Sequence, residues 1–154
     1  MNSDRIPEAS LGAASRFVAA SGLVVDEVTA TSLRGHAELG ADHHTPWGVI
    51  HGGVYATIVE SAGSIGASYA VAERRQFSVG VHNATDFLRS SSGATVQVEA
   101  AALHQGRTQQ LWEVVVSDEA TGKVLARGQL RLQNVPLPDS GPDHDSNEKK
   151  VSLR

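Results

Sequence analysis

The stretch TPWGVIHGGVYATIVESAGSIGASY, residues 45–69, decides the fold of this chain. It begins as a loop, passes a glycine pair and continues as a run typical of one long helix, expected from about Gly52 to Glu73. From Gly53 to Ala72 only Glu60 carries a charge, and a helix that is apolar or small on every side is normally buried all round. Because burying a bare carboxylate is prohibitively costly, Glu60 is expected to be paired, protonated or functional.

The composition limits the function classes open to the chain. Its 154 residues suffice for one domain, and a net charge of −4 argues against a broad nucleic-acid surface but leaves room for a small basic site for a phosphorylated ligand. Without cysteine, disulfides, thiolate catalysis and cysteine-based zinc sites are excluded. The first residues have no apolar signal core, so a cytoplasmic location is expected. The long helix contains Glu60 and many Gly and Ser residues, so it is not expected to span a membrane.

The remaining sequence predicts one short helix and about six strands. Leu11 to Ala20 has apolar residues at helical spacing, and Ser21-Gly22 ends the run. Alternation of apolar and polar residues predicts half-buried strands at 33–39, 77–81, 96–102 and 126–132, with further strands at 23–28 and 111–117. Residues 118–123 are a polar hairpin loop.

The order of these elements indicates an α+β fold. A helix, two strands, a long buried helix and four strands joined by short turns favour an antiparallel sheet of about six strands wrapped around the central helix. We expect a flexible N-terminus at 1–9, one domain at 10–133 and a disordered tail at 134–154, which is rich in Pro, Asp and Ser.

A motif at the start of the long helix connects this arrangement to a known family. The pattern G-x-x-H-G-G at Gly48 to Gly53, with Glu60 seven residues after the last glycine, resembles that of the hotdog-fold acyl-CoA thioesterases. The likeness covers about residues 20–133 and is greatest to the phenylacetate-pathway type and to its relative, 4-hydroxybenzoyl-CoA thioesterase. The resemblance implies hydrolysis of an acyl-CoA to free acid and coenzyme A, by a homodimer or a dimer of dimers. It implies no cofactor, because coenzyme A is part of the substrate, and no metal, nucleic-acid or membrane partner.

The resemblance also implies roles for individual residues. Glu60 is the expected nucleophile or general base, the Gly52 backbone N–H polarises the thioester carbonyl after His51, and Ser64 helps to orient the attacking water. Thr45 departs from the pattern, because the family usually has Asn or Gln there, and Arg89-Ser90 stands where Arg/Lys-Pro is common. The turn Gly106-Arg107-Thr108 matches a segment used near the nucleotide end of coenzyme A. The candidate substrate-binding residues are Gly53, Thr57, Asn83, Arg89, Arg107 and Thr108.

The chemistry supports the same assignment without the family. A helix N-terminus offers unpaired N–H groups to a developing oxyanion, and Gly52 and Gly53 leave them unobstructed. Glu60 is a base or nucleophile, and arginine is a forked phosphate donor. Gly52 and Glu60 are eight residues apart, about 12 Å along one helix, whereas a reacting carbonyl must lie within roughly 3 Å of its donor and its base. Gly52 of one subunit is therefore predicted to face Glu60 of another across a two-fold interface.

Each of these residues also has an alternative, purely structural interpretation. Glu60 is alternatively a structural carboxylate paired with an arginine. Gly52 and Gly53 are alternatively a point of tight packing. His51 is expected to shape the turn rather than transfer protons. Ser64 and Thr57 lie one turn from Glu60, where either is able to hold Glu60 or a water, and Ser64 is alternatively just a small residue in a crowded helix. Arg89 and Arg107 are alternatively solvated surface charges. Trp47 and Tyr55 are expected to belong to the core or to the wall of the pocket. A metal site at His43, His44 and His51 matches no recognised ligand spacing.

Two rival functions remain. A non-catalytic acyl-CoA binding or sensing module on the same fold is left open by Thr45 but disfavoured by the presence of Glu60. A hotdog dehydratase needs a catalytic His beside an Asp or Glu, which the H-G-G context does not match.

Overall fold

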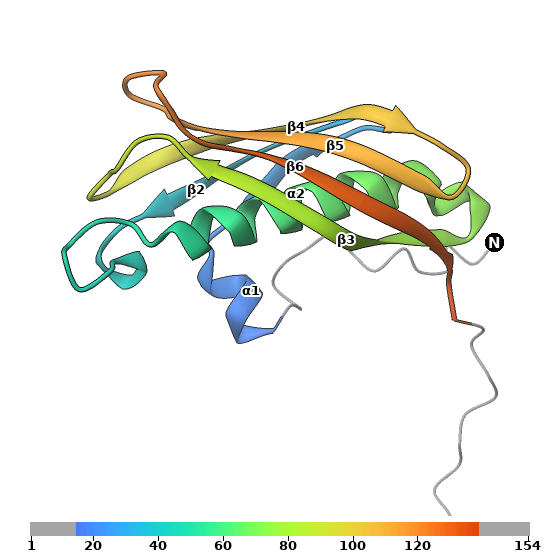
Figure 1. The fold of residues 1–154 in the computed structure, drawn as a ribbon, viewed down its shortest axis with the longest axis horizontal. Coiled ribbons are helices and arrows are strands. Elements are labelled where there is room, and N and C mark those ends of the chain that lie inside the picture. Colours follow the sequence, from blue (N-terminus) through green and yellow to red (C-terminus); the bar gives the residue numbers. More distant parts are fainter. Residues whose placement is uncertain (1–14, 139–154) are drawn as a thin grey trace, which may run out of the picture.

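A computed structural model of the protein describes residues 15–138. In chain order the elements are α1 (Arg16–Ala20), β1 (Val24–Val28), β2 (Ser32–Leu39), the 3₁₀ turn η2 (Ala41–His43), α2 (Gly52–Val71), the 3₁₀ turn η3 (Ala72–Arg74), β3 (Gln76–Phe87), β4 (Ala94–Gln105), β5 (Gln109–Asp118) and β6 (Val124–Pro136). Figure 1 shows the curved sheet lying over α2, with β3 crossing in front of the helix. This is the predicted α+β arrangement of a hotdog fold.

The helix α2 lies under the sheet because one side of it carries small and apolar residues. Its buried positions include two glycines, Gly63 and Gly66. A Cβ at Gly63 would meet the Leu130 side chain at 2.6 Å, and one at Gly66 would meet the Trp112 ring at 2.7 Å. The glycines therefore occur where the sheet packs close against the helix, as their presence in a helix predicts.

The six strands form one sheet in the order β1-β2-β4-β5-β6-β3, with antiparallel pairing throughout. The predicted alternation is confirmed in β2, β4 and β6, whose alternate residues are buried against α2. The buried set includes Leu33, Ala37, Val96, Val98, Leu130 and Leu132. β1 and β3 are the two edges, so β3 has a hydrogen-bonding neighbour in β6 only.

The edge strand β3 changes faces in its middle. Its pairing with β6 shifts between Gly80 and His82, which leaves Val81 as an extra residue in a bulge. Before the bulge, Ser78 and Gly80 face the helix; after it, Asn83, Thr85 and Phe87 do. A bulge reverses the face of every later residue, since side chains alternate along a strand. The alternating apolar residues Val79 and Val81 lie on the exposed side, at 37% and 53% exposure, rather than in the core.

The structure corrects two predicted boundaries. Residues 134–136 do not belong to a tail, because β6 continues to Pro136, which pairs with Gln76. Asn134 is buried there and takes part in a hydrogen-bond network with Ser78 and Gln110. The α-helix α2 ends at Val71, and the predicted last turn to Glu73 is 3₁₀.

The first helix ends at Ala20, as predicted, but none of its residues is buried, and Phe17 is 73% exposed. Residues 11–14 of the predicted helix lie outside the described residues, as do the expected flexible N-terminus at 1–9 and residues 139–154 of the expected tail. Among the helices of residues 15–138, none is long and apolar enough to cross a membrane.

Candidate active site

Glu60 lies on the side of α2 that faces the edge strand β3. Its Oε2 accepts a hydrogen bond of 3.0 Å from Asn83 Nδ2, and its Oε1 lies against Gly80, where a Cβ would collide with it. The residue is partly buried in the single chain rather than fully enclosed. None of the ion pairs found within residues 15–138 includes Glu60, so the paired-arginine reading has no support there.

The N-terminus of α2 presents a backbone amide. His51 is the N-cap, and its Nδ1 accepts a hydrogen bond of 2.8 Å from the Gly53 N–H. This is the contact expected of a residue that shapes the turn, and it occupies the Gly53 amide. Gly52 is the first helical residue, whose N–H has no partner within a helix. The Phe87 ring packs over Gly52, so that a Cβ there would lie 2.8 Å from the ring.

In the loop before α2, the Thr45 side chain bonds to the backbone of its own loop. The Thr45 hydroxyl accepts a hydrogen bond of 3.3 Å from the Trp47 N–H, and the Thr45 carbonyl accepts one of 3.1 Å from the Gly48 N–H. The hydroxyl thus closes a local turn. Trp47 is 84% exposed at the tip of this loop, so it is not a core residue.

The two predicted neighbours of Glu60 on α2 differ in their contacts. The Thr57 hydroxyl donates to the Gly53 carbonyl at 2.8 Å, a bond within the helix that directs it away from Glu60. Ser64 is partly buried one turn after Glu60. Its role in orienting water stays a prediction.

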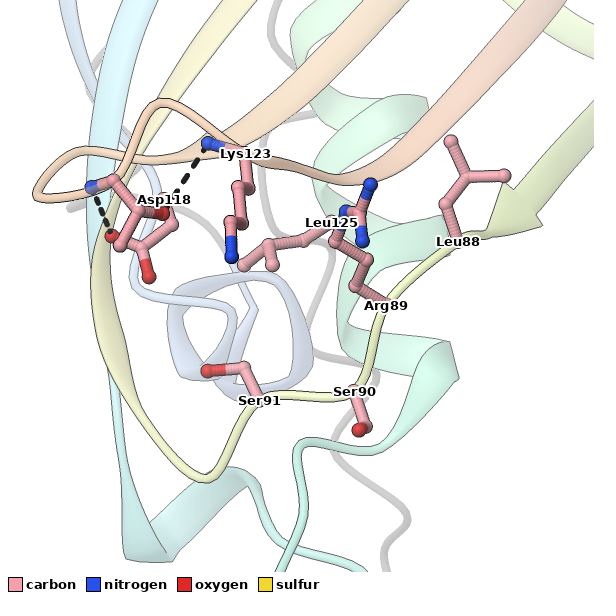
Figure 2. Close-up of a pocket in the computed structure, with 8 residues that line it drawn as sticks. Leu88, Arg89, Ser90, Ser91, Asp118, Lys123 and Leu125 are labelled. Carbon is pink, nitrogen blue, oxygen red and sulfur yellow. Dashed lines mark hydrogen bonds between the residues drawn. The ribbon is translucent and has the colours of Figure 1, made fainter.

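An open groove of about 550 Å³ lies at the Gly52 end of the molecule. Its lining includes Arg89, Ser90 and Ser91 from the connection after β3, and Lys123 from the β5–β6 hairpin. Figure 2 shows the Lys123 side chain reaching across toward the segment that carries Ser91. The Ser91 carbonyl accepts a hydrogen bond from the Ile50 N–H at 2.8 Å, which ties this groove to the loop just before Gly52.

The turn at Gly106-Arg107-Thr108 lies at the opposite end of the sheet. Asn134 Nδ2 donates to the Gly106 and Arg107 carbonyls, and the Asn134 N–H donates to the Thr108 carbonyl at 2.8 Å. The Arg89 N–H, by contrast, bonds to the Leu125 carbonyl. Leu125 and Asn134 are nine residues apart on β6, about 30 Å along the strand. One subunit therefore cannot direct Arg89 and Arg107 to a single phosphate.

Sequence reasoning missed Asn134 and its partner Gln110. Gln110 Nε2 donates to Asn134 Oδ1 at 2.8 Å, and Gln110 Oε1 accepts from Trp112 Nε1 at 2.9 Å. The signal was available, because the alternation of β6 continues from Leu130 and Leu132 to Asn134. A polar residue at an inward position marks a buried hydrogen-bond network as well as the end of a strand.

The three histidines near the motif bond to separate backbone atoms. Besides the His51 contact, His43 Nε2 lies 2.8 Å from the Ala20 carbonyl oxygen, and His44 Nε2 contacts the Ser92 carbonyl oxygen. Within residues 15–138 no group of three or more His, Asp or Glu side chains is arranged to hold a metal ion.

Comparison with known proteins identifies the family of the chain that carries this site. The thioesterase superfamily model matches residues 48–125, which are 78 of the 154 residues and include both Gly52 and Glu60. The chain belongs to the thioesterase superfamily. The fold and motif of the site therefore agree with the family that the sequence resembled.

Relatives and a solved structure extend the likeness. A protein named as an esterase in two strains of Mycobacterium tuberculosis is 48% identical over 90 residues, which span 57% of this chain and 64% of that protein. The 1,4-dihydroxy-2-naphthoyl-CoA thioesterase 2 of Arabidopsis thaliana is 32% identical over 138 residues, covering 84% and 87% of the two chains. The crystal structure of AziG from S. sahachiroi is 34% identical, with a TM-score of 0.75 over 80% of this chain and 98% of that one.

Proposed function

We propose that this protein hydrolyses an acyl-CoA thioester. Water and R–CO–S–CoA give R–COOH and HS–CoA: the carbonyl carbon gains a bond to oxygen, the C–S bond breaks with its electron pair on sulfur, and the thiolate takes up a proton. The observation that carries the proposal is the position of Glu60, whose carboxylate faces the open edge strand without an ion-pair partner within the described chain. The thioesterase family supports the reaction class.

Glu60 is the nucleophile or the general base, and the Gly52 N–H is the oxyanion donor. In one alternative the carboxylate attacks the carbonyl carbon and expels the thiolate, and water then hydrolyses the resulting anhydride to the free acid. In the other it takes a proton from the water that attacks the carbonyl carbon directly. The Gly52 N–H, at the positive end of the α2 dipole, donates to the carbonyl oxygen as negative charge develops on it. His51 keeps the neighbouring Gly53 amide occupied, so Gly52 is the amide that remains for the substrate.

We propose that each site forms between two copies of the chain. Gly52 and Glu60 both lie on α2, about 12 Å apart, which is too far for both to contact one carbonyl group. If Gly52 of each copy faces Glu60 of the other, the two-fold axis passes beside Ala56, midway between them. The Ala56 carbonyl accepts a hydrogen bond of 3.2 Å from Asn83, in the second half of the edge strand β3. Pairing of two β3 edges around this point would also satisfy the unpaired backbone groups of this edge strand.

The same two-fold symmetry also indicates where the phosphates of coenzyme A would bind. In such a dimer the two α2 helices run in opposite directions, so the Arg89 end of one subunit lies at the Arg107 end of its partner. The segments that carry the two arginines, about 30 Å apart along β6 in one chain, would thereby lie on the same side of each shared site. Arg89 and Lys123 line one groove, and we assign phosphate binding to them and to the partner's Arg107.

The test is thiol release from aromatic and aliphatic acyl-CoAs by the wild type and by Glu60→Ala. We expect the variant to lose at least about 10²-fold in rate, the scale of a catalytic acid–base group. The exposed Glu99→Ala, on the outer face of β4, is the matched control and should keep the wild-type rate. Full activity in Glu60→Ala would exclude this mechanism. If wild type binds acyl-CoAs but releases no thiol from any of them, the protein is the binding module instead.

A further inference from the structure

The structure assigns Asn83 and Thr85, on the helix-facing side of β3, to the positioning of the Glu60 carboxylate. This inference deepens the proposed function and rests on it for the meaning of Glu60. Asn83 lies 23 residues from Glu60 in sequence, and the sequence analysis placed it among residues that contact substrate. Its hydrogen bonds point to a different role.

The Asn83 amide has no donor left for a ligand. A side-chain amide carries two N–H donors on Nδ2, and the Asn83 pair goes to Glu60 Oε2 at 3.0 Å and to the Ala56 carbonyl at 3.2 Å. The Ala56 carbonyl belongs to the helical turn that precedes Glu60. Asn83 thus holds the carboxylate and the helix that carries it at fixed relative positions.

Thr85 fixes which way the amide points. Its hydroxyl donates to Asn83 Oδ1 at 2.6 Å, so the amide cannot rotate without losing this bond. Thr85 is itself packed against the adjacent strand: a Cβ at Gly128 of β6 would lie 2.7 Å from the Thr85 hydroxyl oxygen. Thr85, Asn83 and Glu60 form a chain in which each side chain orients the next.

This chain selects one carboxylate oxygen for reaction. Asn83 donates to Oε2, whereas Oε1 accepts no hydrogen bond from the described residues and lies in the space that a side chain at Gly80 would fill. Gly80 is on the edge strand next to the bulge, where a second copy of the chain and its substrate would approach. We therefore infer that Oε1 is the oxygen that attacks the carbonyl carbon or takes the proton from water, and that Asn83 keeps it directed toward that side.

The bulge in β3 makes this arrangement possible. If β3 continued through Val81 as a regular strand, alternation would turn His82, Ala84 and Asp86 to the helix in place of Asn83 and Thr85. The polar pair faces Glu60 only because the strand changes faces between Gly80 and His82. Bulges next to active sites commonly redirect side chains in this way.

The experiment compares Asn83→Leu and Thr85→Val with the wild type in steady-state thiol release. Both substitutions keep the approximate size and remove the hydrogen bonds. For Asn83→Leu we expect kcat to fall about 10²-fold, the scale of a reactive group misplaced by about 1 Å, and KM to change less than about threefold. Thr85→Val should lose about tenfold in kcat, since Asn83 remains but is free to turn. Gln129→Ala, an exposed amide on the neighbouring strand β6, is the matched control and should behave as wild type.

Crystal structures of the two variants give a readout that does not depend on turnover. We expect the Glu60 carboxylate to leave its position against Gly80 in both. Unchanged kcat in Asn83→Leu, a raised KM with kcat unchanged, or an undisplaced Glu60 would overturn the inference while leaving the hydrolase proposal intact. If instead the proposed hydrolase function is wrong, the wild type will release no thiol or Glu60→Ala will keep full activity. The position of Glu60 in Asn83→Leu would still decide the positioning role.

Discussion

Tyr55 stands in the first turn of α2, three residues after the proposed oxyanion donor. It is only 2% exposed, and its hydroxyl has no hydrogen-bond partner among the described residues. Burial raises the pKa of the Tyr55 hydroxyl, and the Asp118 carboxylate adds to the shift. The ring lies 6.4 Å from that of Phe87, which covers Gly52. The aromatic ring of Tyr55 therefore packs against the residues of the site, while burial of its unpaired hydroxyl lowers the stability of the folded protein.

Tyr55→Phe is expected to stabilise the protein by about 1 kcal/mol, because an unsatisfied buried hydroxyl carries a desolvation penalty. Urea denaturation of both proteins measures the change. Tyr69→Phe, on the same helix but 43% exposed, is the matched control and should shift the free energy of unfolding by less than about 0.5 kcal/mol. A clear loss of stability in Tyr55→Phe would mean that the hydroxyl has a partner in the folded protein.

The contact between α2 and β5 depends on the absence of a side chain at Gly66. A Cβ there would meet two atoms of the Trp112 ring at 2.7 and 2.8 Å. The ring cannot easily withdraw, because it is fully buried and its Nε1 donates to Gln110 Oε1. Gly66 thus allows a helix and a sheet to approach at the one place where the largest core side chain lies.

Overpacking a core costs about 1–3 kcal/mol, and alanine in place of glycine returns about 1 kcal/mol in a helix interior. Gly66→Ala is therefore expected to destabilise the protein by up to about 2 kcal/mol. Urea denaturation checks it, with Ser61→Ala on the same helix as the control, expected to remain within about 0.5 kcal/mol of wild type. A more stable Gly66→Ala would show that the helix can move away from β5 at little cost.

At the scale of the whole molecule, the proposed site depends on the proposed dimer. Gly52→Pro removes the donor N–H, and Gly52 is the first residue of α2, the helix position where proline is best tolerated. His51 already has the extended backbone that precedes proline, with φ −67° and ψ 133°. The Phe87 ring over Gly52 must shift, and it is 56% exposed. The substitution therefore tests the amide with limited effect on the fold.

Co-expression of Gly52→Pro with Glu60→Ala, each inactive alone, is expected to restore activity. A mixed dimer contains one site with an intact Gly52 from one chain and an intact Glu60 from the other. Random pairing makes half of the dimers mixed, with one working site in two, so about a quarter of the wild-type rate should return. Differently tagged chains allow the mixed dimer to be purified and assayed for thiol release. A mixed dimer as inactive as its parents would argue that each site lies within one chain.

The sequence by itself determined the fold and the two residues proposed to do the chemistry. Alternation at 33–39, 96–102 and 126–132 and the uncharged run of α2 are local signals, because side-chain period follows directly from secondary structure. Glu60 was conspicuous as the one charge in that run, and Gly52 as the glycine at its start. The glycines of α2 likewise predicted the close approach of the sheet.

Only the tertiary structure decided what surrounds Glu60. The bulge at Val81 reverses the face of the second half of β3. The adjacent Gly80 is a general signal for a bulge within a strand, but it does not indicate which residue is the extra one. Period-2 reasoning therefore placed Val79 and Val81 in a regular strand and did not connect Asn83 or Thr85 to Glu60. The alternation of β6 reaches Asn134, but the partners that bury it, Ser78 and Gln110, are 56 and 24 residues away in sequence. A periodic pattern reports which face a residue takes within its own element, whereas a bulge and a buried polar network depend on what another strand places opposite.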